Sequence, residues 1–232
     1  MQKCCTSCIK GADGFLKCPY CKGYSVKNGK SRCGKQRFHC KICKRYFLEY
    51  YTRESYRPKI NEKIIRLLKE GFGISNLSRY LNISKTTVLR RIHVIAEKLR
   101  RPPVLFNQTY EIDEQWTYVK SKSQPTWIIY ALCRETKQIV DFVVGSRTNE
   151  IIGRVVNKLV LSNPIKIYTD KLLNYRTLIP AYIHVTKRGG TNHIERQNLE
   201  NRKDLKRLGR KTICYSKSIA ILSACLKIYF WG

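Results

Sequence analysis

Residues 109–119 read Thr-Tyr-Glu-Ile-Asp-Glu-Gln-Trp-Thr-Tyr-Val, and this stretch decides the fold. Its aromatic and β-branched residues predict a strand with Asp113 near the middle. Side chains alternate along a strand, so Glu111 and Asp113 share one face and Glu114 faces the other way. The chain has only 16 acids, so an acid placed inside an apolar strand is informative.

Two further acids complete a predicted cluster. Asp170 closes the apolar strand Ile-Lys-Ile-Tyr-Thr-Asp, and Glu195 opens a strongly basic helix. An acid on a strand, one at a strand end and one on a helix can converge at a single sheet edge. Such a cluster, with Asp113, holds two divalent cations about 3.5–4 Å apart, the geometry for in-line displacement at phosphorus. The alternative is that these are ordinary surface, turn or capping acids.

The charge of the chain points to a polyanionic partner. Lys and Arg number 46 against 16 Asp and Glu, which gives +30 over 232 residues. Such a surplus favours nucleic acid as the binding partner. The alternative is a solvated basic surface, as in a ribosome-associated protein, which would still bind nucleic acid. The N-terminus has no apolar signal region and the chain has no run of about 18 apolar residues, so we expect no membrane segment and a cytoplasmic, nucleoid-associated protein.

Two Cys-x2-Cys knuckles lie 18 residues apart among the eleven cysteines. Without an export signal, they favour metal ligation over disulfides and predict a structural Zn²⁺ site rather than four unrelated thiols. The ligands are Cys18, Cys21, Cys40 and Cys43. Four other cysteines and a histidine in this region are not needed for that site: Cys4, Cys5, Cys8, Cys33 and His39. Free thiols are the preferred interpretation of these cysteines, and a second metal site or a different ligand set is the alternative. Core packing is expected for Cys133, Cys214 and Cys225.

Residues 59–100 have the pattern of a helix-turn-helix unit. Apolar residues keep a period of 3.6, glycines at 71 and 73 end the first helix, and Ser75 and Ser84 are the predicted caps of the next two helices. On the third helix, Thr86 and Thr87 are placed to touch base edges, with Arg90 and Arg91 on phosphates or guanine. The alternative is a three-helix module used for packing or dimerisation.

The whole chain divides into three predicted domains: a zinc-ribbon module at 1–52, a helix-turn-helix domain at 57–101 and a catalytic domain at 105–232. The first contains strands near 36–39 and 46–51, and a polar linker covers 52–58. In the last domain the pattern predicts a mixed α/β sheet flanked by helices. Strands are expected at 109–119, 126–134, 138–145, 165–170 and 182–187, and helices at 149–161, 192–208 and 216–229.

Several motifs occur in the order typical of one known family. They are Cys-Pro-Tyr-Cys, Asp-Glu-Gln-Trp-Thr-Tyr-Val, Tyr-Thr-Asp (168–170), His-Ile-Glu-Arg-Gln-Asn-Leu (193–199), Leu-Gly-Arg-Lys-Thr (208–212) and Ser-Lys-Ser (216–218). From about Cys18 to Tyr229 the chain resembles transposases of the insertion-sequence-one family. Two positions depart from the family: Lys171 stands where relatives often have Gly, and the chain ends soon after Tyr229.

The resemblance implies a ribonuclease H-like catalytic domain whose Asp-Asp-Glu triad is Asp113, Asp170 and Glu195. It implies cleavage at transposon ends with Mg²⁺ or Mn²⁺, and joining of the freed 3′-OH to target DNA. It also implies that the N-terminal zinc and helix-turn-helix part binds the terminal inverted repeats. Mg²⁺ is the preferred metal, because it needs only a few carboxylates beside phosphate oxygens and waters.

We therefore expect a DNA transposase that acts as a dimer or higher homo-oligomer on DNA. Arg202 follows Glu195 by seven residues on one helix face, which predicts a phosphate contact about 10 Å along the axis; the alternative is a generally basic helix. One rival function is a non-catalytic DNA-binding regulator on an inert scaffold. Another is a ribonuclease H-fold nuclease that cuts without joining strands.

Overall fold

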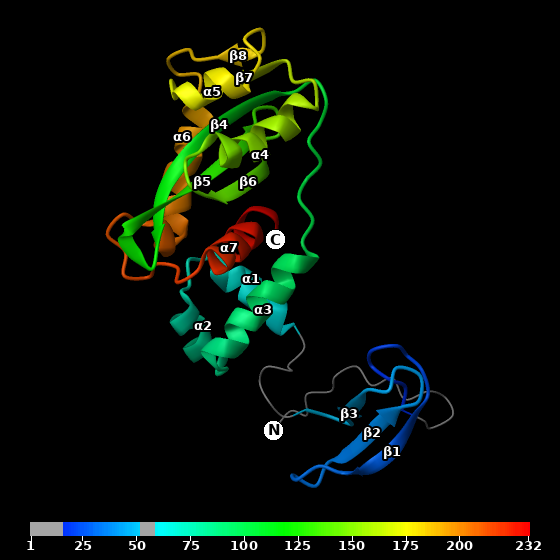
Figure 1. Ribbon diagram of the computed structural model, residues 1–232. Coiled ribbons are helices and arrows are strands. Elements are labelled where there is room, and N and C mark those ends of the chain that lie inside the picture. The colour runs from blue at the N-terminus through cyan, green and yellow to red at the C-terminus, as the bar shows by residue number, and fades with distance from the viewer. Residues whose placement is uncertain (1–15, 52–58) are drawn as a thin grey trace. The chain divides into compact units, whose positions relative to one another are not determined.

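The computed structural model describes residues 16–51 and 59–232, and the chain forms two compact units. The smaller unit extends to residue 63 and includes 81–83. The larger unit holds 64–80 and 84–232 (Figure 1). The predicted linker at 52–58 and the cysteines at positions 4, 5 and 8 lie outside the described residues.

The smaller unit contains a three-stranded antiparallel sheet in the order β1-β2-β3. Its strands are β1 (Ser25–Lys30), β2 (Gln36–Cys40) and β3 (Tyr46–Leu48). The two predicted strands are present and β1 was not anticipated, since its polar sequence has a single β-branched residue, Val26. The core is small, with Leu16, Phe38 and Phe47 buried around Cys18 and Cys40.

Three helices form the helix-turn-helix unit: α1 (Ile60–Lys69), α2 (Ile74–Leu81) and α3 (Lys85–Lys98). Ser84 caps α3, its side chain accepting the backbone N–H of Thr87 at 3.1 Å, as predicted. Ser75 is not a cap, because α2 already begins at Ile74. Gly71 has φ +81°, and a Cβ there would lie 2.3 Å from the carbonyl oxygen of Asp204, so this turn requires glycine.

A five-stranded mixed sheet organises the larger unit, in the order β6-β5-β4-β7-β8. Its strands are β4 (Thr109–Val119), β5 (Ser121–Cys133), β6 (Ile139–Gly145), β7 (Lys166–Tyr168) and β8 (His184–Val185). Strands β4 to β6 form an antiparallel meander, while β7 runs parallel to β4 and β8 parallel to β7. This is the strand order of a ribonuclease H-like fold, as the family resemblance implied.

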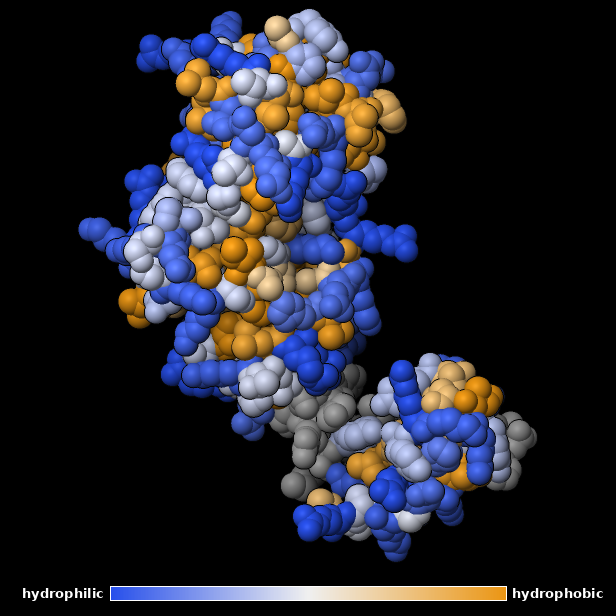
Figure 2. All heavy atoms as spheres, in the orientation of Figure 1, coloured by the Kyte–Doolittle hydropathy of each residue, from blue (hydrophilic) through white to orange (hydrophobic). Residues whose placement is uncertain are grey.

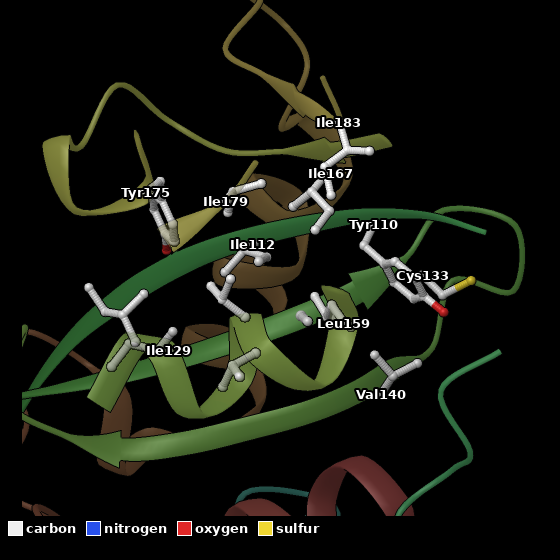
Figure 3. Close-up of a cluster of buried hydrophobic side chains, with 14 residues drawn as sticks. Tyr110, Ile112, Ile129, Cys133, Val140, Leu159, Ile167, Tyr175, Ile179 and Ile183 are labelled. Atoms are coloured by element: carbon white, nitrogen blue, oxygen red, sulfur yellow. The ribbon is translucent and has the colours of Figure 1, made fainter. Parts of the chain in front are cut away.

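Helices cover both faces of this sheet (Figure 1). On one face, α4 (Asn149–Val160) and α5 (Leu173–Leu178) enclose the main apolar core, where Ile112 and Ile129 meet Leu159 (Figure 3). On the other face, α6 (Asn192–Asp204) contacts β4 and β5, and α7 (Ile219–Trp231) contacts β6 and α3. Hydrophilic side chains dominate the surface seen in Figure 2, in keeping with the charge of +30.

Several elements of the larger unit differ from the sequence prediction. The helix predicted at 192–208 ends at Asp204, because Leu205 leaves the helical conformation (φ −99°, ψ 93°) to become buried, and a 3-10 turn, η2 (Lys206–Leu208), follows. The strand predicted at 182–187 is reduced to two residues, and α5 was not predicted at all. Both deviations occur in short segments, where propensity is weakest against tertiary packing.

Candidate active site

The edge of β4 at Asp113 is open because its neighbour is short. Strand β7 pairs with β4 only from Thr109 to Glu111 and ends at Tyr168. Asp170 therefore lies just beyond the end of β7, beside the unpaired stretch of β4 that carries Asp113. Because β7 is shorter than β4, the two acids meet at a sheet edge, as predicted.

Three carboxylates gather at this open edge. Oxygens of Asp113, Glu114 and Asp170 all lie within 4.8 Å of one another. Glu114 does face the other way along the strand, as predicted: its carboxylate accepts a hydrogen bond from the Tyr175 hydroxyl of α5 and pairs with Arg147 at 2.9 Å. The sequence did not indicate that Glu114 belongs to the cluster. Alternation along a strand places the side chains of neighbouring residues on opposite faces of the sheet, but at an unpaired strand edge two such side chains can still approach each other.

The surroundings of the cluster suit a hard cation. Burial, together with the negative charges of Glu114 and Asp170, raises the pKa of Asp113 to about 6, although the backbone N–H of Glu114 and the Asn198 amide act in the opposite direction. Repelling carboxylates, all oxygen donors, match the ligand preference of Mg²⁺ or Mn²⁺. The guanidinium of Arg147, which stands 3.8 Å from Asp170, already places positive charge there. The Asp170 side chain is 43% exposed, which leaves access for a substrate.

Helix α6 is tied to β4 by polar contacts. Asn198 donates from Nδ2 to Oδ2 of Asp113 at 2.6 Å, and Asn201 donates to Gln115 at 3.0 Å. The Tyr130 hydroxyl on β5 donates to Oδ1 of Asn198 at 2.9 Å, which fixes the orientation of that amide. These bonds hold one face of α6 against the carboxylate cluster.

Glu111 fixes the start of the same helix. Its fully buried carboxylate accepts the backbone N–H of Ile194 at 2.9 Å, and it also contacts Arg134 Nε at 2.6 Å and His193 Nδ1 at 2.7 Å. The N–H groups of a first helical turn have no partner within the helix and carry partial positive charge, so a carboxylate from β4 is a suitable cap. Glu111 was placed on the correct face by alternation, but its partner was not foreseen.

Glu195 lies in the first turn of α6, one turn before Asn198. Its side chain is exposed and accepts a hydrogen bond from the Thr191 hydroxyl at 2.7 Å. Within residues 16–51 and 59–232, the close carboxylate group contains Glu114 rather than Glu195. The role of Glu195 as third member of the triad therefore stays a prediction.

Arg202 lies two turns further along α6. Its side chain is half-buried, and its Nε is buried without a hydrogen-bond partner in the described part of the chain. Burial and the nearby charge of Arg210 lower the pKa of the guanidinium, while Tyr130 and Asp113 raise it. The neighbouring Lys203 is exposed.

The residues predicted to read DNA differ in availability. Thr86 and Arg90 are exposed on α3, whereas Arg91 is half-buried. The Thr87 hydroxyl lies 2.8 Å from the Ser84 hydroxyl, within the capping turn. Their role in base or phosphate contact stays a prediction, and Thr86 and Arg90 are the members that face solvent.

The four knuckle cysteines converge in the smaller unit. Sulfur atoms of Cys18 and Cys43 are 3.6 Å apart, and those of Cys21 and Cys40 are 3.5 Å apart. Tetrahedral ligation with Zn–S of about 2.3 Å requires sulfurs about 3.8 Å apart, so the set fits zinc.

The other cysteines lie apart from that cluster. Among the described residues, Cys33 and His39 join no metal-binding group. Cys133 and Cys225 are buried as predicted, but Cys214 is exposed, so its assignment to the core was wrong. It lies in a surface loop although Ile213 and Tyr215 flank it.

Residues 108–230, most of the larger unit, match the family model of the IS1 transposase. The chain belongs to the IS1 transposase family. Insertion element IS1 2 protein InsB of Escherichia coli (strain K12) is 39% identical over 109 residues, which are 47% of this chain and 65% of that protein. Insertion element IS1 protein InsB of Shigella sonnei is 38% identical over 111 residues, 48% of this chain and 85% of that protein. This IS1-family chain thus spans just under two thirds of the length of the Escherichia coli relative.

Among solved structures, the HTLV-2 integrase catalytic core domain in complex with magnesium aligns with this IS1-family chain at a TM-score of 0.36 and 16% identity. The alignment covers 55% of this chain and 86% of that one. Across the described ranges, the helices are all too short or too polar to cross a membrane.

Proposed function

We propose that this chain is a DDE transposase, which cleaves DNA at the ends of its own element and joins the freed 3′-OH to target DNA. The observation that carries the proposal is the convergence of Asp113 and Asp170 at the open edge of a ribonuclease H-like sheet, in a chain of the IS1 transposase family. The charge of +30 supports a polyanionic substrate.

In this proposal, Asp113, Asp170 and Glu195 hold Mg²⁺ or Mn²⁺, and Glu114 is a further ligand or a charge that raises the affinity of the site. The bound metal would activate water or a 3′-OH and stabilise the leaving oxygen. The protein contributes orientation: Asn198 holds one oxygen of Asp113, and Arg147 offsets the charge of Glu114. Exposure of Asp170 gives the scissile phosphate access to the cluster.

We further propose how DNA is held. Residues Thr86, Thr87, Arg90 and Arg91 of α3 read the terminal inverted repeat, and Arg202 grips a phosphate beside the one that is cut. The zinc-ribbon module adds basic surface around a structural Zn²⁺. The protein pairs two ends by forming a dimer or a larger homo-oligomer.

A reconstituted reaction tests the proposal. The protein is incubated with its own flanking DNA ends, Mg²⁺ and a plasmid target, and cleavage and joining are scored on gels. Asp113→Asn, Asp170→Asn and Glu195→Gln should each abolish both steps and leave end binding nearly intact, because each change keeps the shape and removes a charge needed for metal. Adding Glu114→Gln to the series decides which glutamate is essential.

The rival functions give different outcomes in the same assay. Specific end binding by the wild-type protein without cleavage would identify a regulator. Cleavage without joining would identify a nuclease. Near-normal joining by any triad variant would remove that residue from the site.

A further inference from the structure

The loop at residues 209–217 contains parts of two sequence motifs to which the proposed reaction assigns no role. They are Leu-Gly-Arg-Lys-Thr (208–212) and Ser-Lys-Ser (216–218). At the tip of this loop the side chain of Ile213 is 91% exposed. Three exposed basic residues surround it: Arg210, Lys211 and Lys217. Packing within the larger unit does not account for an apolar side chain that is so fully exposed among basic residues.

The loop is fixed rather than loosely displayed. The Tyr118 hydroxyl donates to the Thr212 carbonyl at 2.6 Å, and the backbone N–H of Lys120 donates to the Ser216 carbonyl at 3.0 Å. On the inner side, the buried Arg207 donates to the Ser216 hydroxyl at 3.0 Å. Both flanks of the tip are therefore held by the end of β4, the strand that carries Asp113.

The loop lies close to two elements that are proposed to contact DNA. A hollow of about 560 Å³ is lined on one side by residues 213–218 and on the other by the starts of α2 and α3, including Lys85. On its other flank, Arg210 is close enough to Arg202 to help lower the pKa of that guanidinium, after burial. The loop thus lies between the helix proposed to read the repeat and the arginine proposed to hold the cleaved strand.

We propose that the 209–217 loop is a DNA wedge: Ile213 inserts between two adjacent base pairs of the transposon end, while Arg210, Lys211 and Lys217 hold the flanking phosphates. Apolar wedges of this kind unstack a base step and bend the duplex, which brings more of it against the protein. The inference rests on the proposed function, since it assumes that α3 and the catalytic cluster share one end duplex.

Charge argues against another copy of the chain as the occupant. A symmetric contact between two tips would bring six exposed basic groups together, whereas a duplex supplies the phosphates that they require. Target DNA is the other polyanion in the reaction. The end duplex is favoured because α3 and Arg202 flank the loop.

Base unstacking gives a direct readout. End duplexes, and in a separate series target duplexes, that carry 2-aminopurine at successive positions, one per duplex, are titrated with the full-length protein in Ca²⁺, so that activity does not enter. One position in the end should brighten on binding, and Ile213→Ala should remove that signal. Affinity should change less than about tenfold, because the variant no longer has to unstack the step. Leu161→Ala is the matched control, since Leu161 is an apolar residue with 80% exposure at the end of α4.

The basic residues give a second readout. Each phosphate contact contributes about 0.9 to the slope of log affinity against log salt. The double variant Arg210→Gln, Lys211→Gln should therefore lower the slope for end DNA by about 2. Lys137→Gln, an exposed lysine in the turn between β5 and β6, should leave the slope unchanged.

Failure of the wedge is distinguishable from failure of the proposed function. If the wild-type protein binds and joins its ends but no position brightens, or if Ile213→Ala keeps the signal, the wedge is wrong and the transposase stands. Brightening confined to target duplexes overturns the assignment to the end. If the wild-type protein neither binds nor cleaves its ends, the proposed function itself has failed.

Discussion

Asp113 occupies an environment that disfavours its charged form. Burial, with the charges of Glu114 and Asp170, raises its pKa to about 6 from an ordinary value near 3.8. For an acid with a raised pKa, the contribution to stability is fully present below about pH 4 and is lost as pH rises through 6. The structure therefore stores electrostatic repulsion at neutral pH, which a divalent cation would relieve.

A comparison with Asp113→Asn isolates this effect from the other titrating groups. Between pH 4.5 and 7.5, without divalent cations, the wild-type protein should lose about 2 kcal/mol of unfolding free energy relative to the variant, from a pKa difference of about two units. Calorimetry of the larger unit at both pH values measures it. Parallel pH profiles for the two proteins would show that Asp113 is not repelled as described.

Arg202 and the neighbouring Lys203 differ in burial and in hydrogen bonding. Its Nε is buried without a partner among the described residues, while Lys203 is exposed. Arg202→Ala should lower the rate of joining at saturating DNA more than it lowers affinity for the ends, because the contact proposed for Arg202 is with a phosphate beside the one that is cut. Lys203→Ala, about 100° around the helix, should do less. Small and equal effects would assign Arg202 to the general positive surface.

Among the elements, α6 depends on β4 for its position. Glu111 caps the helix at Ile194, and Asn198 bonds Asp113 one turn later. The helix itself has weak amphipathic character, and Ile194 is its single buried apolar residue. Polar contacts to β4 and β5 therefore set where Glu195 and Arg202 lie.

Glu111→Gln tests that dependence. The change keeps the shape but leaves Arg134 without its buried partner, which should cost about 3 kcal/mol of stability and reduce joining at saturating Mg²⁺ at least tenfold. Glu150→Gln is the control: it breaks a 2.8 Å pair with Arg154 that is largely exposed, and such pairs contribute about 0–1 kcal/mol. Joining by Glu111→Gln at the wild-type rate would mean that α6 is positioned without its cap.

At the scale of the whole molecule, we expect the smaller unit to depend on zinc for its folding. Its core consists of a few residues around the four cysteines, too little apolar surface to fold alone, so zinc ligation should supply the missing free energy. Cys40→Ser should lose the zinc and the folded state of residues 16–51, while the larger unit keeps its melting temperature. Metal analysis and calorimetry follow both. Cys33→Ser should retain one zinc per chain, and a tightly bound zinc in Cys40→Ser would refute this ligand set.

The sequence by itself determined the elements with strong local patterns. The alternation in 109–119 gave β4 and the faces of Glu111, Asp113 and Glu114. The 3.6 period and the Ser84 cap gave the helix-turn-helix, and the two knuckles gave the cysteine cluster. Each of these signals is written within a few consecutive residues, because strand faces, helix faces and short metal loops repeat at fixed local spacing.

Only the tertiary structure decided which groups meet. That β7 stops at Tyr168 leaves the edge of β4 open, so Glu114 joins Asp113 and Asp170 despite facing the other way. The cap that Glu111 places on Ile194 links residues 83 positions apart. The exposure of Cys214 and Ile213 follows from anchors on β4 and η2 that hold the loop outward. Such contacts depend on where strands end and on which side chains remain unpaired after packing, and no local period encodes either.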